Sequence, residues 1–209
     1  MKILAASDVH NDHRVIAKLA EKADKEAVDL VLLCGDLTFA ESDLDGIIGP
    51  FKKVNKKVLL IPGNHETVAA ADFLAKRYSP GVYNMHGRAM LLYNDIGIFG
   101  CGGANIGLFE LGEDEFKSIL TKAHEKVKGA KKKIMMVHVP PHGTNLDMLW
   151  EHVGSKGVRE VIEKIQPDLV LCGHIHETFG KSTTIGKTKV INVGRDGVII
   201  NIDKPKTSS

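Results

Sequence analysis

Side chains that can bind a metal ion recur immediately after the short apolar runs of this chain. They are Asp8, His10, Asp36, Asn64, His138, His174 and His176, with His65 next to Asn64. Neutral imidazoles, carboxylates and an amide oxygen suit divalent ions such as Mn, Fe, Zn, Co or Ni. The residue types therefore indicate a metal centre, provided that the fold brings these separated positions together.

Seven ligand-capable side chains are more than one tetrahedral ion requires, but they suit two ions that share a bridging carboxylate. Two ions about 3.5–4 Å apart can clamp a phosphoryl oxygen and lower the pKa of a bridging water, so that hydroxide attacks phosphorus in line. The remaining histidine, His65, could protonate the leaving alkoxide as a general acid. Phosphoester hydrolysis is the chemistry that this combination predicts.

Each residue also has a purely structural interpretation. Asp8 or Asp36 could cap a helix or a turn, Asn64 could be a turn residue with positive φ, and His138 could be a hydrogen-bonded core histidine. These structural interpretations do not explain why all of the candidate residues lie at the carboxyl ends of five apolar runs. Loops at the carboxyl ends of strands form the binding crevice of open α/β sheets, so one catalytic crevice is the better explanation.

The elements that must position these residues can be predicted from hydrophobic spacing. Apolar runs rich in Val, Ile and Leu predict strands at 2–7, 29–34, 57–62, 89–93, 96–101, 133–139, 168–173, 189–194 and 197–202. Helical spacing predicts helices at 15–27, 114–128 and 155–165, the last with Ser155 as N-cap. Strand–helix alternation in the first half predicts a parallel sheet, and the glycine-rich stretch 177–202 predicts antiparallel hairpins. We expect a single domain over 1–203 and a disordered tail over 204–209.

The motifs, taken in order, resemble a known family. The chain carries Asp8-x-His10, Gly35-Asp36, Gly63-Asn64-His65-Glu66, His138 and Gly173-His174-x-His176. This series is similar to the complete ordered signature of the calcineurin-like metallophosphoesterases, and the loop after His138 is similar to that of the small prokaryotic, Icc-related branch. The resemblance implies an α/β fold, a four-layer αββα sandwich of mixed sheets with a dinuclear metal site at its apex.

The resemblance also implies a role for each motif residue. It assigns the first metal to Asp8, His10 and His176, and the second to Asn64, His138 and His174. It makes Asp36 the bridging ligand and His65 the acid, which touches substrate rather than metal. Asp36, Asn64 and His65 are accordingly the expected catalytic residues. In this assignment the two histidines of the last motif serve different ions.

Several features bear on the substrate. The motif Gly35-Asp36-Leu37-Thr38-Phe39 lacks the arginine of the Ser/Thr protein phosphatases, which argues against that activity. The motifs suit phosphomonoesters and phosphodiesters alike. Without an inserted cap domain, we expect a small phosphoester substrate such as a nucleotide. Asn11, His142 and His152 are candidate substrate contacts, and the alternative for the two histidines is a solvent-exposed loop. Glu66 could orient His65 or begin a helix.

Composition narrows the remaining classes. A formal net charge of +2 does not favour the basic groove of a nuclease or an anionic membrane partner. Three cysteines without a CxxC pair suggest a reducing compartment, and we expect a cytoplasmic protein without a signal peptide or membrane span. Exposed C-terminal strands could pair two copies into a homodimer. The alternative function is a non-catalytic interaction scaffold of the same fold; intact ligands together with His65 favour the enzyme.

Overall fold

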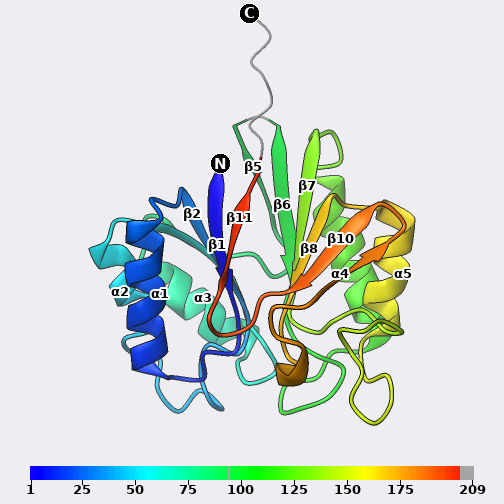
Figure 1. Ribbon diagram of the computed structural model, residues 1–209, viewed down its shortest axis with the longest axis horizontal. Helices are drawn as coiled ribbons and strands as arrows, with labels where there is room; N and C mark the ends of the chain where they lie inside the picture. The colour runs from blue at the N-terminus through cyan, green and yellow to red at the C-terminus, as the bar shows by residue number, and fades with distance from the viewer. Residues whose placement is uncertain (94, 203–209) are drawn as a thin grey trace, which may run out of the picture.

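The computed structural model describes residues 1–93 and 95–202, and it builds them into two β-sheets packed face to face (Figure 1). The first sheet has the strand order β11 (Val198–Asn201), β1 (Lys2–Ala6), β2 (Leu30–Cys34), β3 (Lys57–Ile61) and β4 (Val82–Asn84). Its strands β1 to β4 run parallel, and β11 is antiparallel to β1.

The second sheet has six strands. Their order is β5 (Ala89–Leu92), β6 (Ile96–Cys101), β7 (Lys132–Val137), β8 (Leu169–Cys172), β10 (Thr188–Asn192) and β9 (Ser182–Ile185). Strands β6, β7, β8 and β10 are parallel, whereas β5 and β9 form antiparallel edges. Both sheets are therefore mixed, as the resemblance implied.

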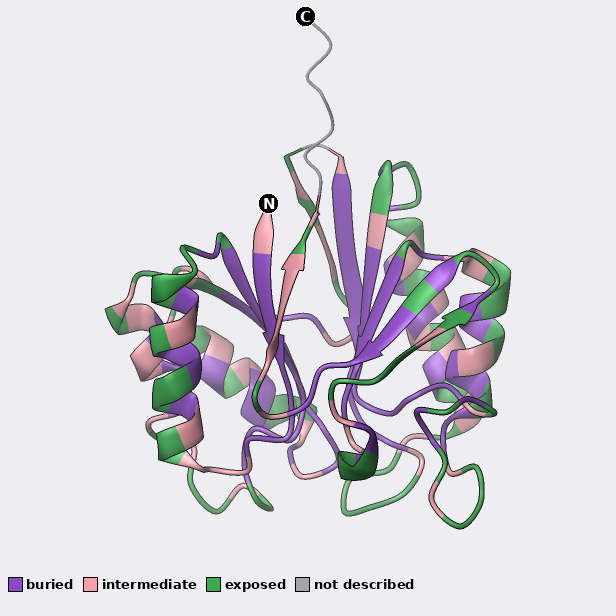
Figure 2. Ribbon diagram, in the orientation of Figure 1, coloured by how far each residue is buried: buried purple, intermediate pink, exposed green. Residues whose placement is uncertain are grey.

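Helices cover the outer face of each sheet (Figure 2). On the first sheet lie α1 (His13–Lys25), α2 (Gly49–Lys53) and α3 (Val68–Arg77); on the second lie α4 (Glu113–Glu125) and α5 (Lys156–Ile165). A short 3-10 helix, η1 (His176–Thr178), follows β8. The order helix, sheet, sheet, helix confirms the predicted four-layer αββα sandwich. No helix within 1–93 or 95–202 has the length and apolar character needed to span a bilayer.

The uninterrupted apolar runs are explained by burial on both faces of each strand. In β1, Leu4 packs beneath the helices of the first sheet, whereas its neighbour Ile3 points into the core between the sheets. In β7, Met135 packs under α4 and α5, and Met136 joins the core between the sheets. Alternate side chains thus fill different layers, and both must be apolar.

Most predicted elements are present, with differences that have physical causes. Strands β9 and β10 form the expected antiparallel hairpin, but β11 leaves that sheet and pairs with β1 of the other one. Helix α3 was not predicted from spacing because its buried face is made largely of alanine, at Ala70 and Ala71. The predicted tail over 204–209 lies outside the described residues.

Candidate metal centre

The loops that follow β1, β2, β3, β7 and β8 meet at one edge of the sandwich, the lower edge in Figure 1. Four of the predicted ligands there have a left-handed backbone: φ is 56° at Asp8, 43° at His10, 50° at Asp36 and 70° at His174. Such a conformation costs a non-glycine residue about 1 kcal/mol or more, and it collects where function requires it. The strain at this edge is thus a first sign of a functional site.

The motif glycines are required by close packing against the ligands. A Cβ atom on Gly63 would lie 2.0 Å from Asp36 Oδ1, and one on Gly173 would lie 2.4 Å from Asp8 Oδ2. Neither carboxylate could keep its position against such a contact. Each glycine therefore allows a loop from one strand to approach the carboxylate at the end of another.

Asp36 lies at the middle of the cluster. Its Oδ2 is 3.4 Å from His138 Nε2, 3.7 Å from His10 Nε2 and 3.9 Å from His65 Nε2. Burial of this carboxyl would raise its pKa, but the charge of His138 and the hydrogen bond from it hold the pKa of Asp36 well below its usual range. One buried, ionised carboxylate therefore faces three imidazoles.

A first donor set is formed by Asp8, His10 and His176, whose ligand atoms all lie within 4.8 Å of one another. His176 Nε2 is 3.5 Å from Asp8 Oδ1, and the backbone N–H of His174 donates to both oxygens of the same carboxylate at 3.1 Å. His10 Nδ1 lies 3.2 Å from the Thr38 carbonyl oxygen. That contact occupies Nδ1, which leaves Nε2 as the donor toward the cluster.

A second donor set is formed by Asp36, His138 and His174, again within 4.8 Å. His138 is fully buried; its Nδ1 donates to the Cys34 carbonyl at 2.8 Å, and its Nε2 donates to Asn64 Oδ1 at 3.1 Å. Burial alone would lower the pKa of His138, but Asp36 raises it to about 10. For His174, burial and the charge of His138 lower the pKa to about 4, so this imidazole is a neutral donor.

His65 stands at the opening of the same cluster. Its ring centroid is 5.1 Å from that of His10 and 4.9 Å from that of Phe39, on which it is stacked at 29°. Its backbone N–H donates to Asp36 Oδ1 at 3.1 Å. By distance alone, His65 forms a further group with His10 and Asp36 that could hold a metal. The structure thus places His65 beside the donor sets, where it could act either as the general acid or as a metal ligand.

A cavity of about 430 Å³ opens over these side chains. The residues that line it are His10, Asp36, Phe39, Asn64, His65, His174 and His176. Imidazoles, buried carboxylates and one amide oxygen are ligands that suit borderline divalent metal ions. A purely structural cluster would not need so many buried charged groups and strained backbone conformations.

Glu66 does not begin a helix, because helix α3 starts after the N-cap Thr67. No hydrogen bond joins its carboxylate to the buried Nδ1 of the His65 ring. Instead, Glu66 accepts hydrogen bonds from Thr38 N at 2.6 Å, from Thr38 Oγ1 at 2.8 Å and from Gly63 N at 2.9 Å. Burial and the charge of Asp36 raise its pKa. Glu66 ties the loop after β2 to the loop after β3 and so supports both motifs.

The amide of Asn11 is engaged by the loop after β2. Its Oδ1 accepts from Phe39 N at 2.6 Å, and its Nδ2 donates to the Asp43 carbonyl. Asp12 caps α1 through Arg14 N and Val15 N. The structure therefore gives Asn11 a role in holding the Phe39 loop.

His142 and His152 meet at a residue that the sequence did not single out. Asp147 is fully buried, and its carboxylate accepts from the backbone N–H groups of Gly143, Thr144 and Gly154 at 2.8–3.1 Å. His152 Nδ1 lies 2.9 Å and His142 Nδ1 3.7 Å from its two oxygens. The rings are 5.6 Å apart. In the sequence, Asp147 is one aspartate in the loop that begins at Pro140, and nothing else there indicated that it anchors this loop.

Comparisons with known proteins agree with this geometry. A family model described as calcineurin-like phosphoesterase matches residues 1–178. A protein of Methanocaldococcus jannaschii, whose own function is uncharacterized, is 30% identical over 203 residues, which are 92% of this chain and 87% of that protein.

Solved structures show the same fold. A Thermus thermophilus protein matches with a TM-score of 0.77 at 20% identity, over 93% of this chain and 90% of that one. A dimetal phosphatase from Danio rerio matches with a TM-score of 0.61 at 12% identity, over 93% and 87% of the two chains. An archaeal phosphodiesterase matches with a TM-score of 0.53 at 18% identity, over 93% and 84%. The family model, which covers residues 1–178, leads to one conclusion: the chain belongs to the calcineurin-like phosphoesterases, a family of metal-dependent hydrolases of phosphoesters.

Proposed function

We propose that this chain hydrolyses a small phosphoester at a centre that holds two divalent metal ions. The observation that carries the proposal is the position of Asp36, whose Oδ2 lies 3.7 Å from His10 Nε2 and 3.4 Å from His138 Nε2. A single carboxylate that faces two donor sets is suited to bridge two ions.

The two donor sets receive the assignments that the motifs imply. The first metal would be held by Asp8, His10 and His176, the second by Asn64, His138 and His174, with Asp36 shared. Mn, Fe, Zn, Co and Ni all suit these ligands. When bound, the ions supply positive charge to the phosphoryl oxygens and lower the pKa of the attacking water.

His65 is the group that we assign to the leaving alcohol. Hydrolysis forms a bond from the water oxygen to phosphorus and breaks the bond from phosphorus to the leaving oxygen, which then needs a proton. His65 lines the cavity, and its Nε2 is 3.9 Å from Asp36 Oδ2, beside the donor sets. Stacking on Phe39 and the backbone hydrogen bond to Asp36 hold the imidazole in this position. A proton on Nε2 could therefore pass to the leaving oxygen.

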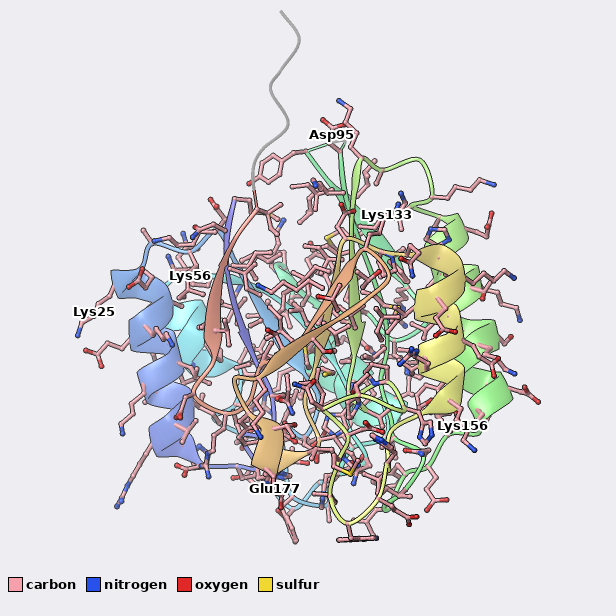
Figure 3. All side chains as sticks on the ribbon, turned by 45° about the vertical axis from the view of Figure 1, so that its right-hand side comes forward. Lys25, Lys56, Asp95, Lys133, Lys156 and Glu177 are labelled. Carbon is pink, nitrogen blue, oxygen red and sulfur yellow. The ribbon has the colours of Figure 1, made fainter. Side chains whose placement is uncertain are left out.

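His142 and His152 are retained as substrate contacts at the rim. The buried Asp147 carboxylate faces the Nδ1 atom of both rings, so their Nε2 atoms point away from the anchor. His152 also lines a cavity of about 470 Å³ together with Glu177, the residue after His176 (Figure 3 labels Glu177 at the lower edge). A phosphoester that reaches this cavity would meet the His152 ring. With Nδ1–H on Asp147, a doubly protonated ring could also donate from Nε2 to an anionic oxygen.

The test is hydrolysis of p-nitrophenyl phosphate and bis-p-nitrophenyl phosphate by protein stripped with a chelator and reloaded with single metals. Turnover that depends on added metal is expected, and the preferred of the two esters separates monoesterase from diesterase activity. Absence of turnover of both esters with Mn, Fe, Zn, Co and Ni would refute the proposal and favour the non-catalytic scaffold.

A further inference from the structure

Phe39 is an aromatic ring that the catalytic cavity leaves open to solvent. It is 60% exposed although it lines the same cavity as Asp36 and Asn64. Its ring stacks on His65 at a centroid distance of 4.9 Å and meets His10 edge-on at 6.4 Å. One face of Phe39 is therefore covered by the imidazole that we assign to the leaving oxygen, and the rest of the ring is open to solvent.

The backbone that carries Phe39 is held in place by hydrogen bonds. Asn11 Oδ1 accepts from Phe39 N at 2.6 Å, and Glu66 accepts from both the N–H and the hydroxyl of Thr38. The buried Glu66 carboxylate thus anchors the residue before Phe39. A ring held this firmly toward solvent keeps apolar area in water, which is unfavourable unless a ligand covers it.

Two further loops at this end of the sandwich carry exposed apolar side chains, although these do not line the Phe39 cavity. In the loop after β6, Leu108 is 61% exposed; this loop packs on the metal centre, since Phe109 N donates to the Asn64 carbonyl at 3.0 Å. In the loop after β7, Trp150 is 83% exposed. Both loops lie with η1 along the lower edge in Figure 2, where exposed stretches surround the strand ends.

The opposite edge of the sandwich carries ion pairs together with exposed apolar side chains, Leu91 and Tyr93. There, Lys132 pairs with Asp168 at 3.2 Å and Lys131 with Asp95 at 3.2 Å (Figure 3 labels Asp95 and Lys133 at the upper edge). Among the exposed large apolar side chains of the described residues, it is Phe39 that lines the cavity of the donor sets. An exposed aromatic ring in a polar cavity fits a ligand with one charged end and one apolar end.

We infer that the substrate is a phosphoester of an apolar alcohol or phenol, and that its apolar group packs on Phe39 beside His65. The inference rests on the proposed function, because it places the phosphoryl end at the two donor sets. Polyol and sugar phosphates would leave the ring uncovered and are expected to bind more weakly than esters with an alkyl or aryl group.

The test uses n-alkylphosphonates, which present one phosphoryl group and an apolar chain of chosen length and cannot be hydrolysed. Their binding to the metal-loaded protein is followed by isothermal titration calorimetry and by inhibition of p-nitrophenyl phosphate hydrolysis. From ethyl to hexyl, affinity is expected to rise about two- to fourfold per methylene. Phe39→Ala should flatten this dependence, whereas Phe39→Leu should retain part of it.

Phe73→Ala is the matched control, because Phe73 is an exposed aromatic ring on α3 that does not line the cavity. It should keep the full dependence on chain length. Affinity that does not change with chain length in the unsubstituted protein would overturn the inference, as would a Phe39→Ala variant with the original dependence. Calorimetry needs no turnover, so a protein that binds long-chain phosphonates without hydrolysing any ester would refute the proposed function alone.

Discussion

Asp36 is the residue on which both donor sets depend, because its carboxylate faces His10 on one side and His138 on the other. Asp36→Asn removes the charge at nearly constant size and is expected to lower bound metal at both sites, from about two ions per chain to below one. Metal analysis after dialysis measures this. Asp12→Asn is the control, since asparagine also caps a helix and Asp12 lies at the start of α1. Retention of two ions by Asp36→Asn would contradict the shared bridge.

His138 connects metal binding to pH. In the metal-free protein its pKa is raised to about 10 by Asp36, so the imidazole is charged at pH 8. Its contribution to stability is complete below about pH 6.5 and is lost as the pH rises through about 10. A metal ligand must be neutral, so loading at pH 8 should release about one proton from this residue. Calorimetry in buffers of different ionisation enthalpy measures the release; heats that do not depend on the buffer would contradict it.

The role of His65 is decided by the leaving group. As an acid, it matters little for p-nitrophenolate and greatly for a poor leaving group such as an alkoxide. His65→Ala should therefore keep two metals per chain and slow alkyl esters about 10²–10⁴-fold, with a much smaller loss for p-nitrophenyl esters. Equal loss for both ester types would exclude the acid role. Loss of one metal would instead favour the ligand role that its distance to Asp36 also permits.

At the residue scale, the sequence predicted which side chains form the metal centre, but not which side chains hold the loops of that centre in place. Metal-ligand types recur at motif spacing, so Asp36 and His138 could be found without coordinates. The role of Glu66 could not, because it depends on hydrogen bonds from Thr38, which belongs to the loop of another motif earlier in the chain. Asn11 is similar, since its amide bonds are made to backbone atoms of Phe39 and Asp43.

At the scale of elements, the central strands were predictable because double-sided burial makes each of them a continuous apolar run. Strand β4 was not predicted, because its three residues do not form such a run. Helix α5 was also predictable, since Ser155 caps it and its buried face is formed by large residues such as Val158 and Ile162. Helix α2 is only five residues long, and α3 buries alanines, so neither has a strong periodic pattern. The partner of β11 could not be deduced, because its pairing with β1 joins the two ends of the chain.

The loop between β7 and α5 is the element whose stability depends most on one side chain. Asp147 accepts hydrogen bonds from three backbone N–H groups and from His152 while fully buried. Asp147→Asn replaces one acceptor oxygen by a donor, so it should destabilise the protein by about 1–3 kcal/mol. Thermal unfolding measures the change, and Asp114→Asn at an exposed ion pair serves as the control. An unchanged melting temperature for Asp147→Asn would contradict the anchor role.

At the scale of the whole molecule, each donor set draws on both sheets. Asp8 and His10 follow β1 of the first sheet, whereas His176 follows β8 of the second. Asn64 follows β3, and His138 and His174 follow β7 and β8. Metal ions held there would link the carboxyl ends of the two sheets, so the cavity and the sandwich depend on each other. The hydrophobic pattern of an individual strand does not show which strands of the other sheet it will meet. The way that the two sheets share the ligands could therefore not be predicted from these patterns.

The central claim is that two ions are needed for hydrolysis. The most direct measurement adds metal stepwise to chelator-treated protein and follows p-nitrophenyl phosphate turnover together with bound metal by native mass spectrometry. We predict that the chain with one ion is nearly inactive and that turnover rises in proportion to the chain with two ions. Full activity at one ion per chain, or no activity at two, would contradict the account.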